Sequence, residues 1–272
     1  MENPNHFVFN IFSTQLNPVA FNLFGIEVKW YGILIALGFL LAIHLCYKRA
    51  PMYKINQESI LDFSLWLIPA SIIGARLYYV AFRFDLYKDD LWSVFNIRAG
   101  GMAIHGGIIA GLLVGLAFCK YHKINPLDLG DLIAPPLALA QAIGRWGNFF
   151  NGEAHGGPTN LPWAISVDGQ MVHPTFLYES TWCLALFFLL SHLGKNRRFN
   201  GQIMLLYGIL YSAERFLVEG LRTDSLMFLG LKQAQIISLG TIIICILLYV
   251  FLNKAHQKSL SSKKTTSKKR HK

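Results

Sequence analysis

Charged residues are scarce in this chain. They make up 15% of its 272 residues, whereas hydrophobic residues make up 53%. Soluble domains carry about 25% charged residues, so this composition excludes an ordinary soluble globular protein. Mean hydropathy is +0.39. The balance is instead that of an integral membrane protein, in which each spanning helix needs about 20 mostly apolar residues.

Several common catalytic and metal-binding motifs are missing as well. The sequence contains no serine in a nucleophile elbow, no zinc motif and no P-loop. Its four cysteines fall in or at the ends of apolar stretches and lack the spacing of metal ligands: Cys46, Cys119, Cys183 and Cys245. They are interpreted as packing residues of a core, and no metal site is expected.

Seven stretches are long and apolar enough to span a membrane: 29–47, 59–82, 102–121, 129–149, 175–193, 201–220 and 233–252. There is no internal repeat and no second soluble domain, so residues 1–253 are expected to form one all-α membrane domain. The first 28 residues show no basic segment followed by an apolar core. The first span is therefore expected to direct the chain to the membrane.

Basic residues are unevenly divided between the two ends of the predicted spans. Sixteen lysines and arginines lie on the side that includes the C-terminus, and five lie on the other side. Because basic loops remain in the cytoplasm, the C-terminus is predicted to be cytoplasmic and the N-terminus to lie across the membrane. The Ser/Lys-rich tail 254–272 cannot form a core and is predicted to be disordered. No nucleic-acid partner is expected.

The connection 150–174 contains no lysine or arginine and is rich in glycine, proline and asparagine. Within it, Asp168-Gly169 lies between apolar residues, which is typical of a β-hairpin turn. We therefore expect a small external cap with short β-strands at about 150–174.

A polar run that begins at Arg145 directly follows an apolar stretch. An arginine near hydrocarbon costs roughly 2.5 kcal/mol or more at mid-depth, so a partner charge or an anionic ligand must offset it. If the helix continues, Arg145 and Asn148 share a face. Glu153 follows in a glycine-rich loop, where it either contacts the ligand or pairs with Arg145. Pro135-Pro136 indicates either one kinked helix or a shorter helix that begins there.

The stretch 201–220 carries a second polar group. Tyr211, Arg215 and Glu219 recur every four residues and form one stripe, which is too polar for lipid and is expected to face the interior of the bundle. Glu219 either neutralises Arg215 or contacts a ligand. Tyr207 and Glu214 lie in the same stretch.

Three further features fall outside these groups. Arg76 either organises the bundle or touches a ligand. His105 is either a proton acceptor at neutral pH or a helix–helix hydrogen-bonding residue, and the role of His173 is open. A glycine every four residues predicts a face for close helix packing: Gly107, Gly111 and Gly115.

Paired guanidinium groups match phosphate best among the common anions, because their planar forks bind its oxygens bidentately. The arginines are therefore predicted to bind a lipid phosphate. Two classes remain at this point, an enzyme or an anion or lipid transporter. Transporters often show inverted repeats, and none is visible here.

The sequence resembles the bacterial prolipoprotein diacylglyceryl transferases from about residue 25 to 250. The most specific motif is Gly144-Arg145-x-Gly147-Asn148-Phe149-x-Asn151-x-Glu153-x-x-Gly156. Other matching motifs follow in the family's order: Trp30-Tyr31-Gly32, Gly74-Ala75-Arg76, His105-Gly106-Gly107, His173-Pro174 with Leu177-Tyr178-Glu179, and Arg215-x-x-Val218-Glu219-x-x-Arg222.

The resemblance implies an enzyme of the bacterial inner membrane with seven transmembrane helices, a periplasmic N-terminus and a periplasmic cap. It would transfer diacylglyceryl from phosphatidylglycerol to the lipobox cysteine thiol of a prolipoprotein, without a cofactor. By analogy, Arg145 and Arg215 hold the phosphate and His105 serves as thiol base or headgroup contact. The expected substrate-binding residues are Tyr31, Arg145, Asn148, Glu153, Gly156, Tyr211 and Glu219.

Overall fold

The chain folds into long helices joined by short loops and small hairpins. A computed structural model describes residues 17–270 except 98, 99, 224 and 229. The described residues form seven α-helices: α1 Trp30–Arg49, α2 Gln57–Phe82, α3 Ile104–His122, α4 Pro126–Asn151, α5 Thr175–Gly194, α6 Gln202–Leu221 and α7 Gln233–Arg270. Short 3-10 helices follow α1 at Ala50–Tyr53 and α2 at Phe84–Leu86 and Leu91–Phe95.

Each helix overlaps one of the seven predicted stretches, so the helical architecture is confirmed. Of the described helices, five are long and apolar enough to cross a membrane, namely those that begin at Trp30, Gln57, Ile104, Thr175 and Gln233. The two others, α4 and α6, carry most of the polar residues singled out above. The described cysteines also match the prediction, since Cys46, Cys119 and Cys183 are buried and Cys245 is half-buried.

In the described part of the chain, three antiparallel hairpins add the short strands: β1 Val19–Leu23 with β2 Ile26–Lys29, β3 Ile165–Val167 with β4 Gln170–Val172, and β5 Met227–Phe228 with β6 Leu231–Lys232. The predicted hairpin at Asp168-Gly169 is confirmed. Asp168 and Gly169 have φ of 49° and 78°, the left-handed conformation that a two-residue type I′ turn requires at both positions.

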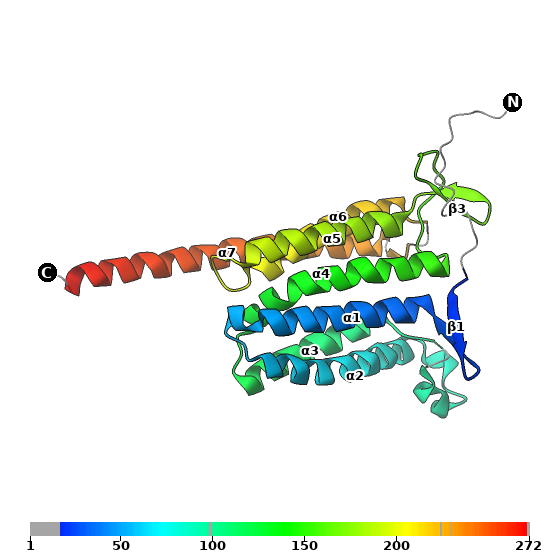
Figure 1. The fold of residues 1–272 in the computed structure, drawn as a ribbon, viewed down its shortest axis with the longest axis horizontal. Helices are drawn as coiled ribbons and strands as arrows, with labels where there is room; N and C mark the ends of the chain where they lie inside the picture. The colour runs from blue at the N-terminus through cyan, green and yellow to red at the C-terminus, as the bar shows by residue number, and fades with distance from the viewer. Residues whose placement is uncertain (1–16, 98–99, 224, 229, 271–272) are drawn as a thin grey trace. The chain divides into compact units, whose positions relative to one another are not determined.

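The chain divides into two units. Unit 2 is Ile43–Leu129, and unit 1 consists of the described parts of Met1–Ala42 and Gly130–Lys272. In unit 2, α2 and α3 lie side by side (Figure 1). The predicted glycine face of α3 packs closely at two of its three positions, because a Cβ at Gly107 would lie 3.3 Å from the Ser71 carbonyl oxygen and one at Gly111 would lie 3.2 Å from Leu67, whereas one at Gly115 would make an ordinary contact of 3.8 Å with Phe63.

In unit 1, α4, α5 and α6 share an apolar core of Ala134, Ala138, Leu186, Leu190 and Ile203. Figure 1 shows α5 and α6 running alongside each other, with β3 near their ends. Pro135 and Pro136 lie inside α4, so a single helix runs through both prolines. The alternative of a shorter helix that begins at the prolines is therefore wrong.

The end of α7 differs from the expected disordered tail. The helix continues to Arg270 and so includes most of 254–272. Lysine, alanine, glutamine and leucine favour helix, and extending an existing helix avoids the unfavourable nucleation of a new one. Residues 271 and 272 lie outside the described part of the chain.

Candidate functional site

Two arginines from different helices converge on one carboxylate in unit 1. Arg145 Nη2 of α4 lies 3.0 Å from Glu179 Oε1, and Arg215 Nη1 of α6 donates a hydrogen bond of 2.8 Å to the same oxygen. Glu179 comes from α5 and its side chain is 1% exposed, whereas the arginine side chains are 19% and 21% exposed. Three helices therefore meet at one carboxylate oxygen.

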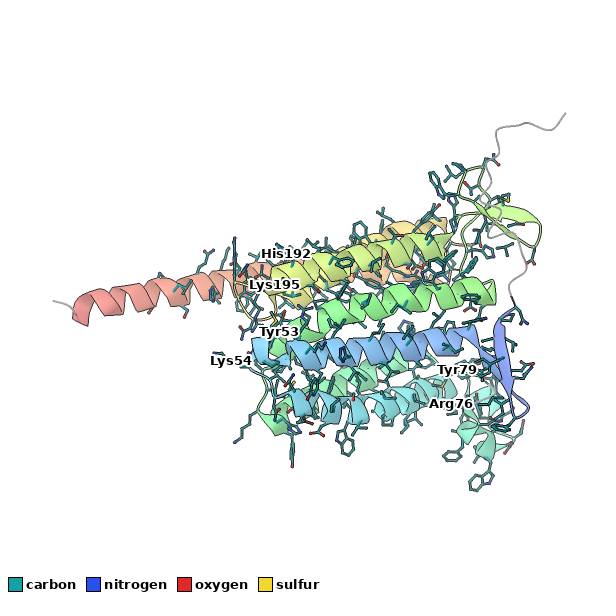
Figure 2. All side chains as sticks on the ribbon, viewed as in Figure 1. Tyr53, Lys54, Arg76, Tyr79, His192 and Lys195 are labelled. Atoms are coloured by element: carbon teal, nitrogen blue, oxygen red, sulfur yellow. The ribbon has the colours of Figure 1, made fainter. Side chains whose placement is uncertain are left out.

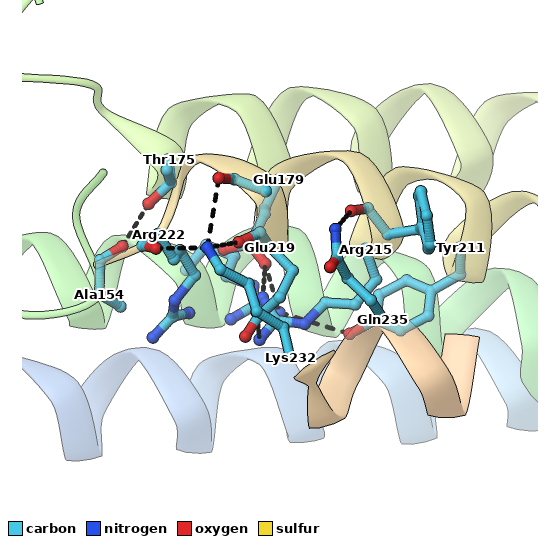
Figure 3. Close-up of polar contacts among 12 residues, drawn as sticks. Ala154, Thr175, Glu179, Tyr211, Arg215, Glu219, Arg222, Lys232 and Gln235 are labelled. Carbon is cyan, nitrogen blue, oxygen red and sulfur yellow. Dashed lines mark hydrogen bonds and ion pairs between the residues drawn. The ribbon is translucent and has the colours of Figure 1, made fainter. Parts of the chain in front are cut away.

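Glu219 and Tyr211 complete this arginine cluster (Figure 3). Arg215 Nη2 lies 2.7 Å from Glu219 Oε2, one turn further along α6. Arg145 Nη2 donates to the Tyr211 hydroxyl at 3.3 Å. Tyr211 and Arg215 thus contact α4 and α5, and the buried Glu219 pairs with Arg215, so the stripe faces the protein interior as predicted.

These contacts show which ion pairs the charged residues form. The acidic partner of Arg145 is Glu179, not Glu153. Arg215 and Glu219 form the ion pair that one alternative proposed. Glu179 stands in one of the matching sequence motifs, but it was given no role there, although an acidic residue inside an apolar span was a signal for one.

The relative register of α4 and α5 at the cluster is fixed by neighbouring hydrogen bonds. Trp146 Nε1 donates to Ser180 Oγ at 3.1 Å, and Ser180 Oγ donates to the Ala142 carbonyl at 2.8 Å. Because Trp146 and Ser180 directly follow Arg145 and Glu179, these bonds hold the ion pair in place.

The beginning of α6 is held by a buried aspartate. Asp131 is 0% exposed, and its Oδ1 accepts from the amides of Ile203 and Met204 at 2.9 Å each. Its Oδ2 accepts from the Gly201 amide at 2.8 Å and from Arg197 Nη1 at 2.7 Å. A carboxylate at a helix N-terminus satisfies amides that have no partner within the helix.

The other end of α6 is held by Lys232, at the end of β6 (Figure 3). Its Nζ donates to the carbonyl oxygens of Glu219 at 2.7 Å, Gly220 at 3.2 Å and Arg222 at 2.7 Å. A cation at a helix C-terminus binds carbonyls that the helix leaves free and interacts favourably with its dipole. Both ends of the helix that carries Arg215 are therefore anchored by charged side chains.

A second polar group lies at the end of α4. Asn148 Nδ2 and Asn151 Nδ2 donate to Glu153 Oε1 at 3.1 and 3.2 Å. This group lines a pocket of about 400 Å³. The remaining lining residues come from the residue before β1, from α4 and the loop after it, from β3 and its turn, and from α5: Pro18, Phe149, Phe150, Gly152, His155, Ile165, Ser166, Val167, Asp168 and Phe176.

Tyr31 and Gly156 both make close packing contacts with other parts of the chain. The Tyr31 ring packs over α4, because a Cβ at Gly147 would lie 2.6 Å from Tyr31 Cδ2. A Cβ at Gly156 would lie 2.7 Å from the Cβ of His173 and 3.2 Å from the Leu221 carbonyl oxygen. Gly156 therefore permits close approach of backbone segments of this chain itself.

Arg76 belongs to unit 2 (Figure 2), where its partners are backbone carbonyl groups of the chain itself. Its guanidinium donates to the carbonyl oxygens of Val94 at 2.8 Å, Ser93 at 2.7 Å, Gly100 at 2.7 Å and Gly101 at 3.0 Å. The side chain thus holds the loop between α2 and α3, which favours the organising role among the two alternatives.

His105 and His173 have aromatic neighbours. His105 is half-buried in unit 2, where its ring lies 6.1 Å from that of Tyr78. In unit 1, the Nδ1 of His173 lies 3.3 Å from the Tyr178 hydroxyl, which also accepts from Trp163 Nε1 at 2.8 Å. In the described part of the chain, no three histidine, cysteine, aspartate or glutamate side chains gather as a metal site would require.

Comparison with known proteins decides the family. The family model described as prolipoprotein diacylglyceryl transferase matches residues 18–251. The chain belongs to the prolipoprotein diacylglyceryl transferase family. This match includes the complete arginine cluster and the pocket at the end of α4, and it confirms the resemblance seen in the sequence.

Several curated relatives have the same name, phosphatidylglycerol–prolipoprotein diacylglyceryl transferase. The protein from Clostridioides difficile (strain 630) is 48% identical over 246 residues, which cover 90% of this chain and 99% of the relative. The one from Finegoldia magna is 49% identical over 245 residues, with coverage of 90% and 99%. The one from Streptococcus suis (strain 05ZYH33) is 45% identical over 250 residues, with coverage of 88% and 93%.

Family membership and the apolar helices together make this prolipoprotein diacylglyceryl transferase a multi-pass membrane enzyme of the transferase class. The alternative of an anion or lipid transporter is thereby excluded.

Proposed function

We propose that this transferase holds the phosphate of phosphatidylglycerol between Arg145 and Arg215 while the diacylglyceryl group passes to the lipobox cysteine of a prolipoprotein. The observation that supports this most is the meeting of both guanidinium groups at one carboxylate oxygen, 3.0 and 2.8 Å away. An oxygen of a phosphodiester has the same charge and size as the oxygen that they already bind.

Both guanidinium groups have capacity for a further anion. Among the described residues, the contacts of Arg145 all use Nη2, and a guanidinium has five N–H donors in a planar fork. The arginine side chains are about one-fifth exposed while Glu179 is fully enclosed. A ligand can therefore approach the arginines from the side opposite Glu179. Glu179 itself keeps the two arginines aligned.

The reaction places its developing charge on the phosphate. The thiolate sulfur attacks the glycerol carbon that bears the phosphate, a C–S bond forms, and the C–O bond breaks with its electron pair on the phosphate oxygen. The thiol proton is taken up by a base or by the departing phosphate, and the products are a thioether and glycerol phosphate. Donors aimed at such an oxygen stabilise the transition state.

The remaining predicted residues receive supporting roles in this proposal. Asn148 and Glu153 position the headgroup, since they lie on or just after the helix that carries Arg145. Tyr31 and Tyr211 line the site, and Glu219 orients Arg215. His105 serves as the thiol base or as a headgroup contact, because a neutral imidazole accepts protons near neutral pH.

The proposed orientation follows the distribution of basic residues. All seven helices cross the inner membrane, the N-terminus and the cap at 150–174 face the periplasm, and the C-terminus faces the cytoplasm. Support comes from the segment 150–174, which contains no lysine or arginine, and from the eight basic residues of the tail.

The experiment is to incubate the purified protein with phosphatidylglycerol and a lipobox peptide and to measure diacylglyceryl-peptide by mass spectrometry. Arg145→Ala is expected to accumulate in membranes and to form no product. The control is Arg198→Ala, which removes an exposed arginine outside the cluster and is expected to retain activity. Full activity of Arg145→Ala would exclude the phosphate assignment.

A further inference from the structure

Among the described residues, no strand lies beside one edge of the β3–β4 hairpin. In a hairpin with a two-residue turn, the residues next to the turn exchange hydrogen bonds, and the following pair directs its N–H and C=O groups outward. That outward pair is Ser166 and Met171. The Met171 carbonyl accepts from the Thr159 amide at 2.9 Å, so one edge of the hairpin is covered by the chain itself.

Ser166 directs its N–H and C=O to the opposite edge. Among the described residues, no backbone group pairs with them. Unpaired edges of this kind are ready templates for an additional strand.

Ser166 and its neighbours Ile165 and Val167 line the pocket of about 400 Å³ at the end of α4. The same pocket is lined by Asn148, Asn151 and Glu153, whose side chains form the amide and carboxylate group described above. Phe149, Phe150 and Phe176 supply apolar surface to the same pocket. The pocket therefore combines backbone donors and acceptors with polar and apolar side-chain contacts, which are the contacts that an extended peptide requires.

The hairpin rests on a packed apolar cluster and is near the arginine cluster in sequence through α4. Ile165, Val172 and Phe176 are 3–6% exposed and pack together beneath the hairpin. Asn148 lies three residues after Arg145 on α4, which is about 4.5 Å along a helix axis. A peptide in the pocket would thus have its neighbouring residues within reach of the phosphate site.

We infer that the acceptor segment of the prolipoprotein binds here as an added β-strand, with one of its residues hydrogen-bonded to the N–H and C=O of Ser166. This inference rests on the proposed function for the identity of the peptide. Strand addition obtains its affinity from main-chain hydrogen bonds and leaves most side chains unspecified, so one enzyme can accept many prolipoproteins.

The test uses acceptor peptides in which the cysteine is replaced by serine, so that they bind without reacting. Each peptide has a fluorescent label and one N-methylated backbone amide, moved along the sequence. Binding to the full-length protein in phosphatidylglycerol nanodiscs is measured by fluorescence anisotropy. We expect N-methylation at one position to weaken binding about fivefold, the value of one net hydrogen bond, while its two neighbours bind as the unmodified peptide does.

Tolerance of N-methylation at every position would overturn the inference, and so would an equal loss at all positions, because neither pattern comes from a strand. The neighbouring positions of the same peptide are the matched controls, and the protein itself is unchanged in this experiment.

A variant of the protein provides the complementary measurement. Ser166→Pro removes the outward N–H, and proline is tolerated at such a position because no bond of the hairpin is lost. We expect it to bind the unmodified peptide about fivefold more weakly. Unchanged binding by Ser166→Pro would contradict strand addition.

The two proposals fail in distinguishable ways. Arg145→Ala is expected to lose transfer but to bind the peptide with the same position-specific sensitivity to N-methylation. If Arg145→Ala remains active while one N-methylated position still weakens binding, the phosphate assignment fails and the peptide site stands. If Arg145→Ala is inactive and N-methylation weakens binding at no position, the phosphate assignment stands and the peptide site fails.

Discussion

Glu179→Gln tests whether the buried carboxylate aligns the two arginines. The substitution preserves side-chain size and removes the negative charge that lies 3.0 Å from Arg145 and 2.8 Å from Arg215. Removing one partner of a buried ion pair costs about 3–5 kcal/mol. The lower end applies here, because the guanidinium groups are partly exposed and the amide oxygen still accepts one hydrogen bond.

The expected effect on catalysis follows from geometry. Without the shared anion, the two cations repel each other and move apart, and a displacement of about 1 Å at a reacting centre costs about a hundredfold in rate. We therefore expect kcat/KM to fall by about a hundredfold, which corresponds to about 2.7 kcal/mol, together with a lower melting temperature.

The assay follows diacylglyceryl-peptide formation at several phosphatidylglycerol concentrations, with thermal unfolding measured on the same preparations. Glu27→Gln, at an exposed position in β2, is the matched control and is expected to behave as the wild type. A wild-type rate for Glu179→Gln would refute the reasoning. A lower KM for phosphatidylglycerol would refute it as well, since Glu179 would then only compete with the phosphate.

Three further predictions concern single residues. Activity of His105→Gln is expected to be low at pH 7 and to recover at higher pH. The acceptor thiol has a pKa of about 8.5, so more of it is ionised at higher pH without the help of a base. If the rate profile instead shows an equal loss at all pH values, the histidine has a binding role. Asp131→Asn removes the charge of a carboxylate that accepts four hydrogen bonds at the start of α6. Thermal unfolding is expected to show destabilisation of about 3 kcal/mol, and an unchanged melting temperature would contradict this role. Gly156→Ala is expected to lose about 1–3 kcal/mol by overpacking, and adding His173→Gly, which removes the Cβ in its way, should recover part of the loss in the same measurement.

The stability of α6 and the geometry of the arginine cluster are linked. Asp131 anchors the first turn of α6 and Lys232 its last carbonyls, while Arg215 lies between them. A change at either end is therefore expected to reach the arginine cluster through the position of the helix.

Local patterns were sufficient for part of this protein. The length and composition of each apolar stretch predicted the seven helices, because each span satisfies its backbone hydrogen bonds internally and needs no distant partner. Asp168-Gly169 predicted its hairpin for a similar reason, since the turn conformation depends on those two residues. The motif around Arg145 was enough to identify the family.

Other features were decided only by the tertiary structure. The sequence placed Arg145 and Arg215 inside the protein, but not Glu179 between them, and it left Arg76 with two roles. Periodicity restricts a side chain to one face of its helix, whereas the choice of partner depends on how neighbouring helices rotate and pack. The outward groups of Ser166 are a further case, because which edge of a hairpin stays open depends on where the segment around Thr159 returns.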